Sequence, residues 1–192
     1  MFNYLENNPS KKLNRLLLII GIIIFIPIYY LNYQLILINF NLNILNELLT
    51  SFNTNNFKEV FHSISQKGQL NDLFVVYLLN IVSIIGFALI FFSITLIIAR
   101  SINKDLKIYK LSYIPPLLVI VIALFDILPS IILLIIIKSP NIISDLTTYF
   151  ISGSYIFRMI LIYIVFLWII VMGIFLIMKY IRKRVFNAKN AS

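Results

Sequence analysis

The chain contains no cysteine, only one histidine, and seven acidic residues against sixteen lysines and arginines. Without cysteine, disulfide bonds, thiolate metal sites and thiol catalysis are all excluded. The single histidine, His62, lies in a polar segment, where we expect a solvated side chain and not a ligand or base. Charged residues form 12% of the chain, about half of their usual share of about 25% in soluble domains.

The sequence also lacks the short motifs of common catalytic sites. It has no glycine-rich phosphate loop, no His-Glu-x-x-His and no Gly-x-Ser-x-Gly. An intramembrane aspartyl protease needs two facing acids, and only Asp126 falls within a long apolar segment. No cluster of acidic residues offers a metal site. We therefore expect no catalytic residue, no metal, no cofactor and no enzymatic activity from this chain alone.

Hydrophobic residues, in contrast, form 61% of the chain and gather in four long blocks. Such blocks predict membrane-spanning helices, because about 20 apolar residues cross a hydrocarbon core of about 30 Å. The first block is too long for the apolar region of a signal peptide, so we expect an uncleaved span. The predicted fold is all-α, a four-transmembrane-helix bundle forming a single membrane domain. The predicted spans are 13–38, 73–99, 113–137 and 155–178.

Basic residues lie just outside these spans, and their distribution predicts the orientation. Twelve of the sixteen flank the spans on one side, and three (Lys58, Lys67 and Lys138) lie on the other. The twelve are Lys11, Lys12, Arg15, Arg100, Lys104, Lys107, Lys110, Lys179, Arg182, Lys183, Arg184 and Lys189. The positive-inside rule then places both termini in the cytoplasm. We expect anionic lipid head groups as partners and no nucleic acid, in a bacterial cytoplasmic membrane, with an organelle membrane as the alternative.

The segment 39–72 is the only long polar connection. Its first part, Leu42 to Phe52, has roughly one apolar face, which is typical of a short helix lying in the head-group layer. The alternative is an ordinary loop that carries some apolar residues.

Asp126 lies near the middle of the third predicted span. A carboxyl at that depth costs about 2.5–3.5 kcal/mol on insertion scales, so it should face protein or trapped water. Pro129 lies three residues further on and lacks an N–H, which predicts a kink with exposed backbone oxygen. At helical spacing, Ala123 and Ser130 share the face of Asp126 and Pro129, and we expect that face to point inward.

Arg158 is the candidate partner of Asp126. If the fourth helix begins at Tyr155, Arg158 is shallow enough to reach the outer interface; if it begins nearer Tyr149, Arg158 approaches the level of Asp126. Three roles stay open for Asp126: a neutral acid that donates a hydrogen bond, an ion-pair partner, or a site for a transported cation or proton together with Ser130. We favour the neutral acid, with Arg158 reaching outward.

In the second span, small and hydroxyl-bearing residues fall within one narrow arc of the helix. Ser83, Gly86 and Ser93 form this arc, with Asn80 at its edge. Small residues on one face let helices approach closely in lipid. We expect a helix packing face here and not a permeation path.

One stretch resembles a known family. Residues Ser101 to Leu118 read Ser-Ile-Asn-Lys-Asp-Leu-Lys-Ile-Tyr-Lys-Leu-Ser-Tyr-Ile-Pro-Pro-Leu-Leu. This resembles the segment after the second span of Yip1-domain membrane proteins, where a basic connection leads to a Tyr-x-x-Pro-like helix start, here Tyr113 to Pro116. The family usually has five spans, against four predicted here. The resemblance implies an integral membrane protein without a catalytic centre; the family's eukaryotic members act in vesicle trafficking through protein partners.

Two classes of function follow from these observations. The first is a non-catalytic membrane protein that acts through helix–helix contacts, as a homo-oligomer or as a subunit of a larger membrane complex. The second is a transporter or channel component that uses Asp126 beside the Pro129 kink as an ion or proton site.

Overall fold

The computed structural model describes residues 2–40, 42–104 and 108–189. These residues are helical throughout, apart from short connections, and they include no β-strand. Four helices are long and apolar enough to cross a membrane, which confirms the all-α class and the four apolar spans. The elements are α1 (Phe2–Asn7), α2 (Lys11–Asn39), α3 (Leu42–Thr50), α4 (Thr54–Gln66), α5 (Leu70–Ser101), η1 (Leu111–Tyr113), α6 (Ile114–Lys138), η2 (Pro140–Ile142) and α7 (Asp145–Lys189).

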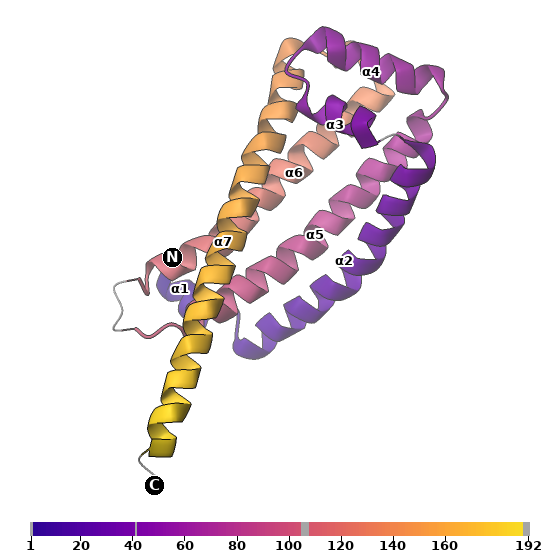
Figure 1. Cartoon of the computed structure of the whole chain (residues 1–192). Coiled ribbons are helices and arrows are strands. Elements are labelled where there is room, and N and C mark those ends of the chain that lie inside the picture. Colours follow the sequence, from indigo (N-terminus) through magenta and orange to yellow (C-terminus); the bar gives the residue numbers. More distant parts are fainter. Residues whose placement is uncertain (1, 41, 105–107, 190–192) are drawn as a thin grey trace.

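The four long helices run up and down in the order of the chain (Figure 1). α2 packs on α5, α5 on α6, and α6 on α7, so that α5 and α6 are central while α2 and α7 form the edges. Both ends of the chain lie at the same end of the bundle, and α3 and α4 lie at the other (Figure 1). The short connection between α6 and α7 favours an antiparallel pair, whereas α2 and α5 are joined by the longer segment that contains α3 and α4.

The polar connection 39–72 forms two helices, so the alternative of an ordinary loop is wrong for residues 42–50. α4 lies across the end of the bundle and α3 lies beneath it (Figure 1). Each helix buries one apolar face, with Leu45 and Leu48 from α3 and Phe57, Val60, Phe61 and Ile64 from α4. These side chains join a core that also contains Leu133 and Ile151 of α6 and α7. α3 therefore packs against the spanning helices through its apolar face.

The fourth spanning helix begins at Asp145, ten residues before the predicted Tyr155. Its start is capped locally: the backbone N–H of Ser144 donates to Thr147 Oγ1 at 2.9 Å, and that of Thr147 donates to Ser144 Oγ at 3.3 Å. The sequence Ser152-Gly153-Ser154 is by itself typical of a turn. Ser152 nevertheless lies within the helix, is fully buried and donates its hydroxyl to the Ser51 carbonyl at 2.8 Å. This tertiary contact overrides the turn-like local sequence.

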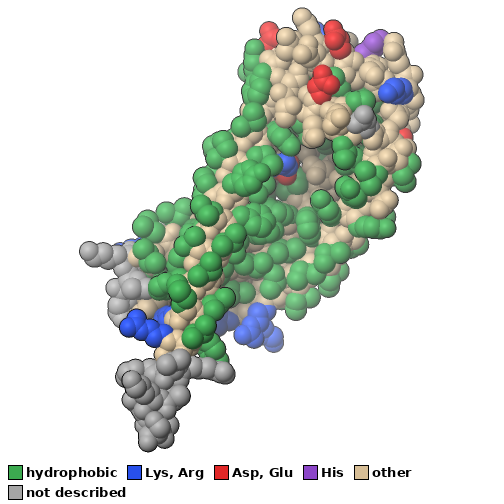
Figure 2. All heavy atoms as spheres, viewed as in Figure 1, with side chains coloured by type: hydrophobic (Ala, Val, Ile, Leu, Met, Phe, Trp, Pro, Cys, Tyr) green, Lys and Arg blue, Asp and Glu red, His purple; other side chains and the backbone are tan. Residues whose placement is uncertain are grey.

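Charged side chains gather at the two ends of the bundle, with an apolar belt between them (Figure 2). Lysines and arginines gather near the chain ends, whereas the end with α3 and α4 carries aspartates and glutamates together with further basic side chains (Figure 2). Lys107 lies outside the described residues, as do the side chains of Lys183, Arg184 and Lys189.

Candidate functional site

Asp126 and Arg158 form an ion pair midway along the bundle. Arg158 Nη1 lies 2.6 Å from Asp126 Oδ1, and both side chains are less than one-fifth exposed. The guanidinium carbon also lies 4.8 Å from the ring centroid of Tyr155, at cation–π distance. The expected outward reach of Arg158 is therefore wrong. Because α7 begins at Asp145, Arg158 sits deep enough along the helix to meet α6.

Other residues on the inward face of α6 lie next to the Asp126–Arg158 ion pair. Ala123, Pro129 and Ser130 are buried as predicted, and α6 continues as a helix through Pro129. Proline has no N–H for the carbonyl one turn earlier, so the backbone oxygen of Phe125 loses its usual intrahelical donor. The Ser130 hydroxyl donates to the Asp126 carbonyl oxygen at 2.8 Å.

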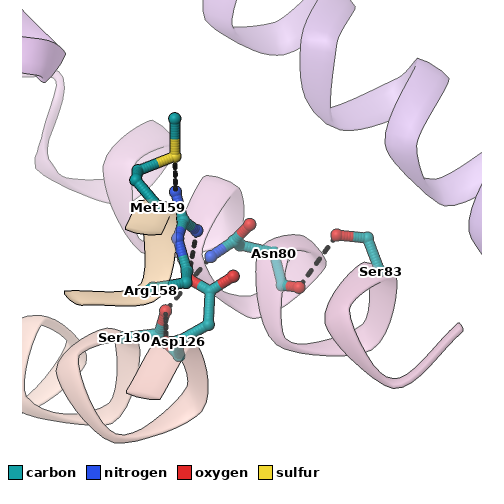
Figure 3. Close-up of polar contacts among 6 residues, drawn as sticks. All are labelled: Asn80, Ser83, Asp126, Ser130, Arg158 and Met159. Atoms are coloured by element: carbon teal, nitrogen blue, oxygen red, sulfur yellow. Dashed lines mark hydrogen bonds and ion pairs between the residues drawn. The ribbon is translucent and has the colours of Figure 1, made fainter. Parts of the chain in front are cut away.

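Asn80 of α5 joins the network from a third helix. Its side-chain Nδ2 donates to Ser130 Oγ at 3.1 Å, while the backbone carbonyl oxygen of Asn80 accepts from the Ser83 hydroxyl at 2.9 Å. Figure 3 shows Asn80, Ser130 and Arg158 converging on Asp126 from three spanning helices. This mostly buried polar group favours one arrangement of α5, α6 and α7, because its hydrogen bonds and ion pair form only when the three helices bring these side chains together.

The ion pair lies on the wall of a cavity of about 380 Å³. Five helices contribute to it, and α3 covers it on the side of α4 through Leu42, Leu45, Asn46 and Leu49. The remaining lining residues are Tyr29, Asn32, Tyr33, Ile36, Val76, Tyr77, Asn80, Phe125, Asp126, Pro129, Ser130, Leu133, Ile151, Tyr155 and Arg158. A hollow with acidic and basic atoms inside it is visible on this face in Figure 2. Its size falls within the range of small-molecule sites, about 300–1,000 Å³.

Two buried polar atoms of the cavity residues lack a hydrogen-bond partner within the described chain: Asn32 Oδ1 and Arg158 Nε. Asn32 comes from α2 and is 7% exposed, whereas Arg158 comes from α7. One atom is an acceptor and the other a donor. Unpaired buried polar atoms are uncommon in proteins and call for a bound partner or a specific reason.

The predicted packing residues of α5 lie on a different part of that helix surface from the cavity. Ser83, Gly86 and Ser93 are buried, and the backbone of Gly86 touches α2. A Cβ on Gly86 would lie 2.8 Å from the Phe25 nitrogen, and one on Gly21 would lie 2.9 Å from the Gly86 oxygen. Gly86 thus serves a close contact between α2 and α5, and the Ser93 carbonyl accepts from Asn14 Nδ2 of α2 at 3.1 Å.

Sequence reasoning missed Asn32 and the cover formed by α3. Nothing in the local sequence around Asn32 indicates that its side chain lines a cavity. The lone histidine is exposed, with its Nε2 3.0 Å from Gln66 Nε2 on the outer surface of α4. Among the described residues, no group of three or more His, Asp or Glu could hold a metal ion.

Comparisons with models of known protein families, with curated proteins and with solved structures find no match to this chain. The resemblance to Yip1-domain proteins stays a prediction.

Proposed function

We propose that this chain is a non-enzymatic membrane protein that binds a small polar solute at Asp126 and Arg158, as the binding part of a carrier. The observation that supports this most is the cavity of about 380 Å³ with an ion pair in its wall, halfway along helices of membrane-spanning length. Charged residues at this depth are costly and usually belong to a solute or ion path.

The chemistry of the cavity favours a zwitterionic solute over a bare cation. A free carboxylate would attract a cation, but Asp126 already has Arg158 as its counter-ion. A molecule with an ammonium and a carboxylate group, such as an amino acid, offers a charge to each member of the pair. It also supplies a donor for Asn32 Oδ1 and an acceptor for Arg158 Nε.

In the proposed orientation, both termini and the basic flanks face the cytoplasm of a bacterial cell. The cavity then lies nearer the outer side of the membrane, beneath α3 and α4. The excess of lysine and arginine at the chain ends supports this orientation, since positive flanks are retained on the cytoplasmic side.

The test is binding of free amino acids to the purified protein in detergent, measured as a rise in the thermal unfolding temperature. A solute present at about 100 times its Kd stabilises the folded state by about 2.7 kcal/mol, which a melting curve resolves. We expect Asn32→Leu, of similar size, to weaken that stabilisation. Gln34→Met is the matched control, since Gln34 lies on the same helix and does not line the cavity.

Failure of every zwitterionic solute to stabilise the wild-type protein would contradict the proposal. Equal weakening by Asn32→Leu and Gln34→Met would also count against the cavity as the binding site. Counterflow of the bound solute in reconstituted vesicles then separates a carrier from a protein that only binds.

The second candidate is a subunit that acts through helix–helix contacts with other membrane proteins or with a second copy. The specific observation in its favour is the low burial of α2 and α7, the two edge helices, compared with α5 and α6. The small-residue face of α5 is already occupied by α2, so partners would contact the outer faces of the edge helices. Affinity purification in mild detergent with identification of co-purifying membrane proteins tests this candidate.

A further inference from the structure

A second cavity lies at the other end of the bundle, between the start of α2 and the end of α5. Its volume is about 240 Å³. It is lined by Lys11, Asn14, Arg15, Ile97, Arg100 and Ser101, so three of its six residues are cations and none is an acid.

The three cations have no acidic partner within the described part of the chain. The ion pairs found there are Arg158 with Asp126 and Lys104 with Glu6. Glu6 is thus engaged elsewhere, and its hydrogen bond with Lys104 lowers the pKa of the Glu6 carboxyl below the usual value. Lys11, Arg15 and Arg100 line the same pocket, and an anion bound there would offset the repulsion between their like charges.

Arg100 is held in position for such an anion. Its Nε and Nη2 both donate to the Leu5 carbonyl oxygen, at 3.1 and 2.7 Å, which fixes the guanidinium against α1. Lys11 lies in the first turn of α2, behind a Ser10 cap whose hydroxyl accepts from the Leu13 N–H at 3.2 Å. The positive end of the helix dipole adds to the charge of the pocket.

Asn14 gives the pocket a buried, unpaired acceptor. The side chain is 1% exposed, and its Nδ2 donates to the Ser93 carbonyl at 3.1 Å. That contact orients the amide, and Oδ1 has no partner in the described chain. A ligand with a hydroxyl group next to its negative charge would satisfy this oxygen.

An apolar groove adjoins the pocket and shares Lys11 and Arg15 with it. The groove continues along the outer surface of α2 over Leu13, Leu16 and Ile19, each at least 45% exposed. Cations at the end of a spanning helix beside exposed apolar side chains match a molecule with an anionic head and a hydrocarbon tail.

We propose that this pocket binds the phosphate head group of an anionic phospholipid. Lys11, Arg15 and Arg100 contact the phosphate, and a head-group hydroxyl donates to Asn14 Oδ1. An acyl chain lies along Leu13, Leu16 and Ile19. Phosphatidylglycerol has the required charge and hydroxyls.

The experiment measures retention of phosphatidylglycerol by the detergent-solubilised full chain, using native mass spectrometry with titration of the lipid. The test variant is Lys11→Gln/Arg15→Gln, in which both changed side chains are exposed. The matched control is Lys179→Gln/Arg182→Gln, which removes the same charge from exposed positions on α7. We expect the test variant to raise the Kd at least about tenfold and the control to change it less than about threefold.

Three further arms separate this site from its alternatives. Phosphatidylcholine with the same acyl chains should bind at least about tenfold more weakly, because its head group is neutral overall and lacks a hydroxyl. Glycerol 3-phosphate as a soluble competitor should not displace the lipid, since it cannot use the groove. Thermal unfolding of both double variants verifies that they are folded.

An equal loss of affinity for phosphatidylglycerol in the two double variants would mean that general surface charge, and not this pocket, retains the lipid. Displacement of the lipid by glycerol 3-phosphate would mean that the pocket binds a soluble phosphate ester and not a lipid. Equal retention of phosphatidylcholine and phosphatidylglycerol would mean that the site does not select an anionic head group.

Discussion

Asp126 and Arg158 show how two charges are accommodated at the middle of an apolar bundle. Each neutralises the other at 2.6 Å, and Ser130 and Asn80 add hydrogen bonds around them. A pair of this kind contributes little net stability, because desolvation of both ions offsets their attraction. We expect the pair to contribute specificity instead, because a shift of α7 along α6 would separate the two side chains.

The pair makes a prediction at the residue scale. Asp126→Asn removes the carboxylate and leaves Arg158 as an uncompensated cation, so we expect the free energy of unfolding to fall by about 3 kcal/mol. Arg158→Gln added to Asp126→Asn should recover part of this loss, because the cation is then removed as well. Denaturant titration in detergent micelles of the wild type, both single variants and the double variant measures the coupling.

An unchanged unfolding free energy in Asp126→Asn would mean that the acid is neutral and only donates a hydrogen bond. A folded Asn variant that loses an ion flux in reconstituted vesicles would instead support the cation-site alternative.

At the scale of elements, the contact between α2 and α5 depends on two glycines. Gly21 and Gly86 face one another so closely that neither position has room for a Cβ without displacing backbone. Close approach of this kind increases van der Waals contact, which drives helix association where lipid tails are as apolar as the side chains.

Gly86→Ala should therefore weaken the bundle. The added methyl group would lie 2.8 Å from the Phe25 nitrogen, so the helices must separate, at a cost of about 1–3 kcal/mol. Gly173→Ala is the control, because a Cβ there meets nothing within 4 Å, and the better helix propensity of alanine should stabilise it by up to about 1 kcal/mol. Thermal unfolding in detergent that leaves both variants alike would refute the assigned contact.

The whole molecule is electrically asymmetric. Apart from Arg158, the lysines and arginines whose side chains the structure describes divide into eight at the end where the chain begins and ends and three at the other end. The eight are Lys11, Lys12, Arg15, Arg100, Lys104, Lys110, Lys179 and Arg182, and the three are Lys58, Lys67 and Lys138. The four antiparallel spanning helices keep the two groups on opposite sides of the apolar belt (Figures 1 and 2). This asymmetry is the physical basis of the proposed orientation.

Single cysteines test that orientation, and the cysteine-free sequence provides a clean background. With a membrane-impermeant thiol reagent, His62→Cys should be labelled in intact cells. Asn8→Cys and Arg182→Cys, at the opposite end, should be labelled only after permeabilisation. Labelling of position 182 but not 62 in intact cells would reverse the orientation, and labelling of 8 together with 62 but not 182 would require an odd number of spans.

The four spans and their order were determined by the sequence alone, because spanning depends on consecutive residues. A run such as Ile114–Lys138 is long and apolar enough to cross the membrane core whatever its neighbours are. The inward face of α6 was predictable for the same reason, since helical periodicity brings Ala123, Asp126 and Ser130 together. Even the wrong start of the fourth helix came from a local signal, the turn-like serines around Gly153.

Only the tertiary structure decided what those helices enclose. The partner of Asp126 depends on the register of α7 against α6, which follows from the true start at Asp145 and from the contact of Ser152 with Ser51. Asn32 of α2 lines the cavity together with residues of α5, α6 and α7, and α3 covers the cavity with leucines that belong to the core. Each of these features depends on contacts between residues distant in sequence. Local hydropathy is compatible with several helix arrangements, and only side-chain packing distinguishes among them.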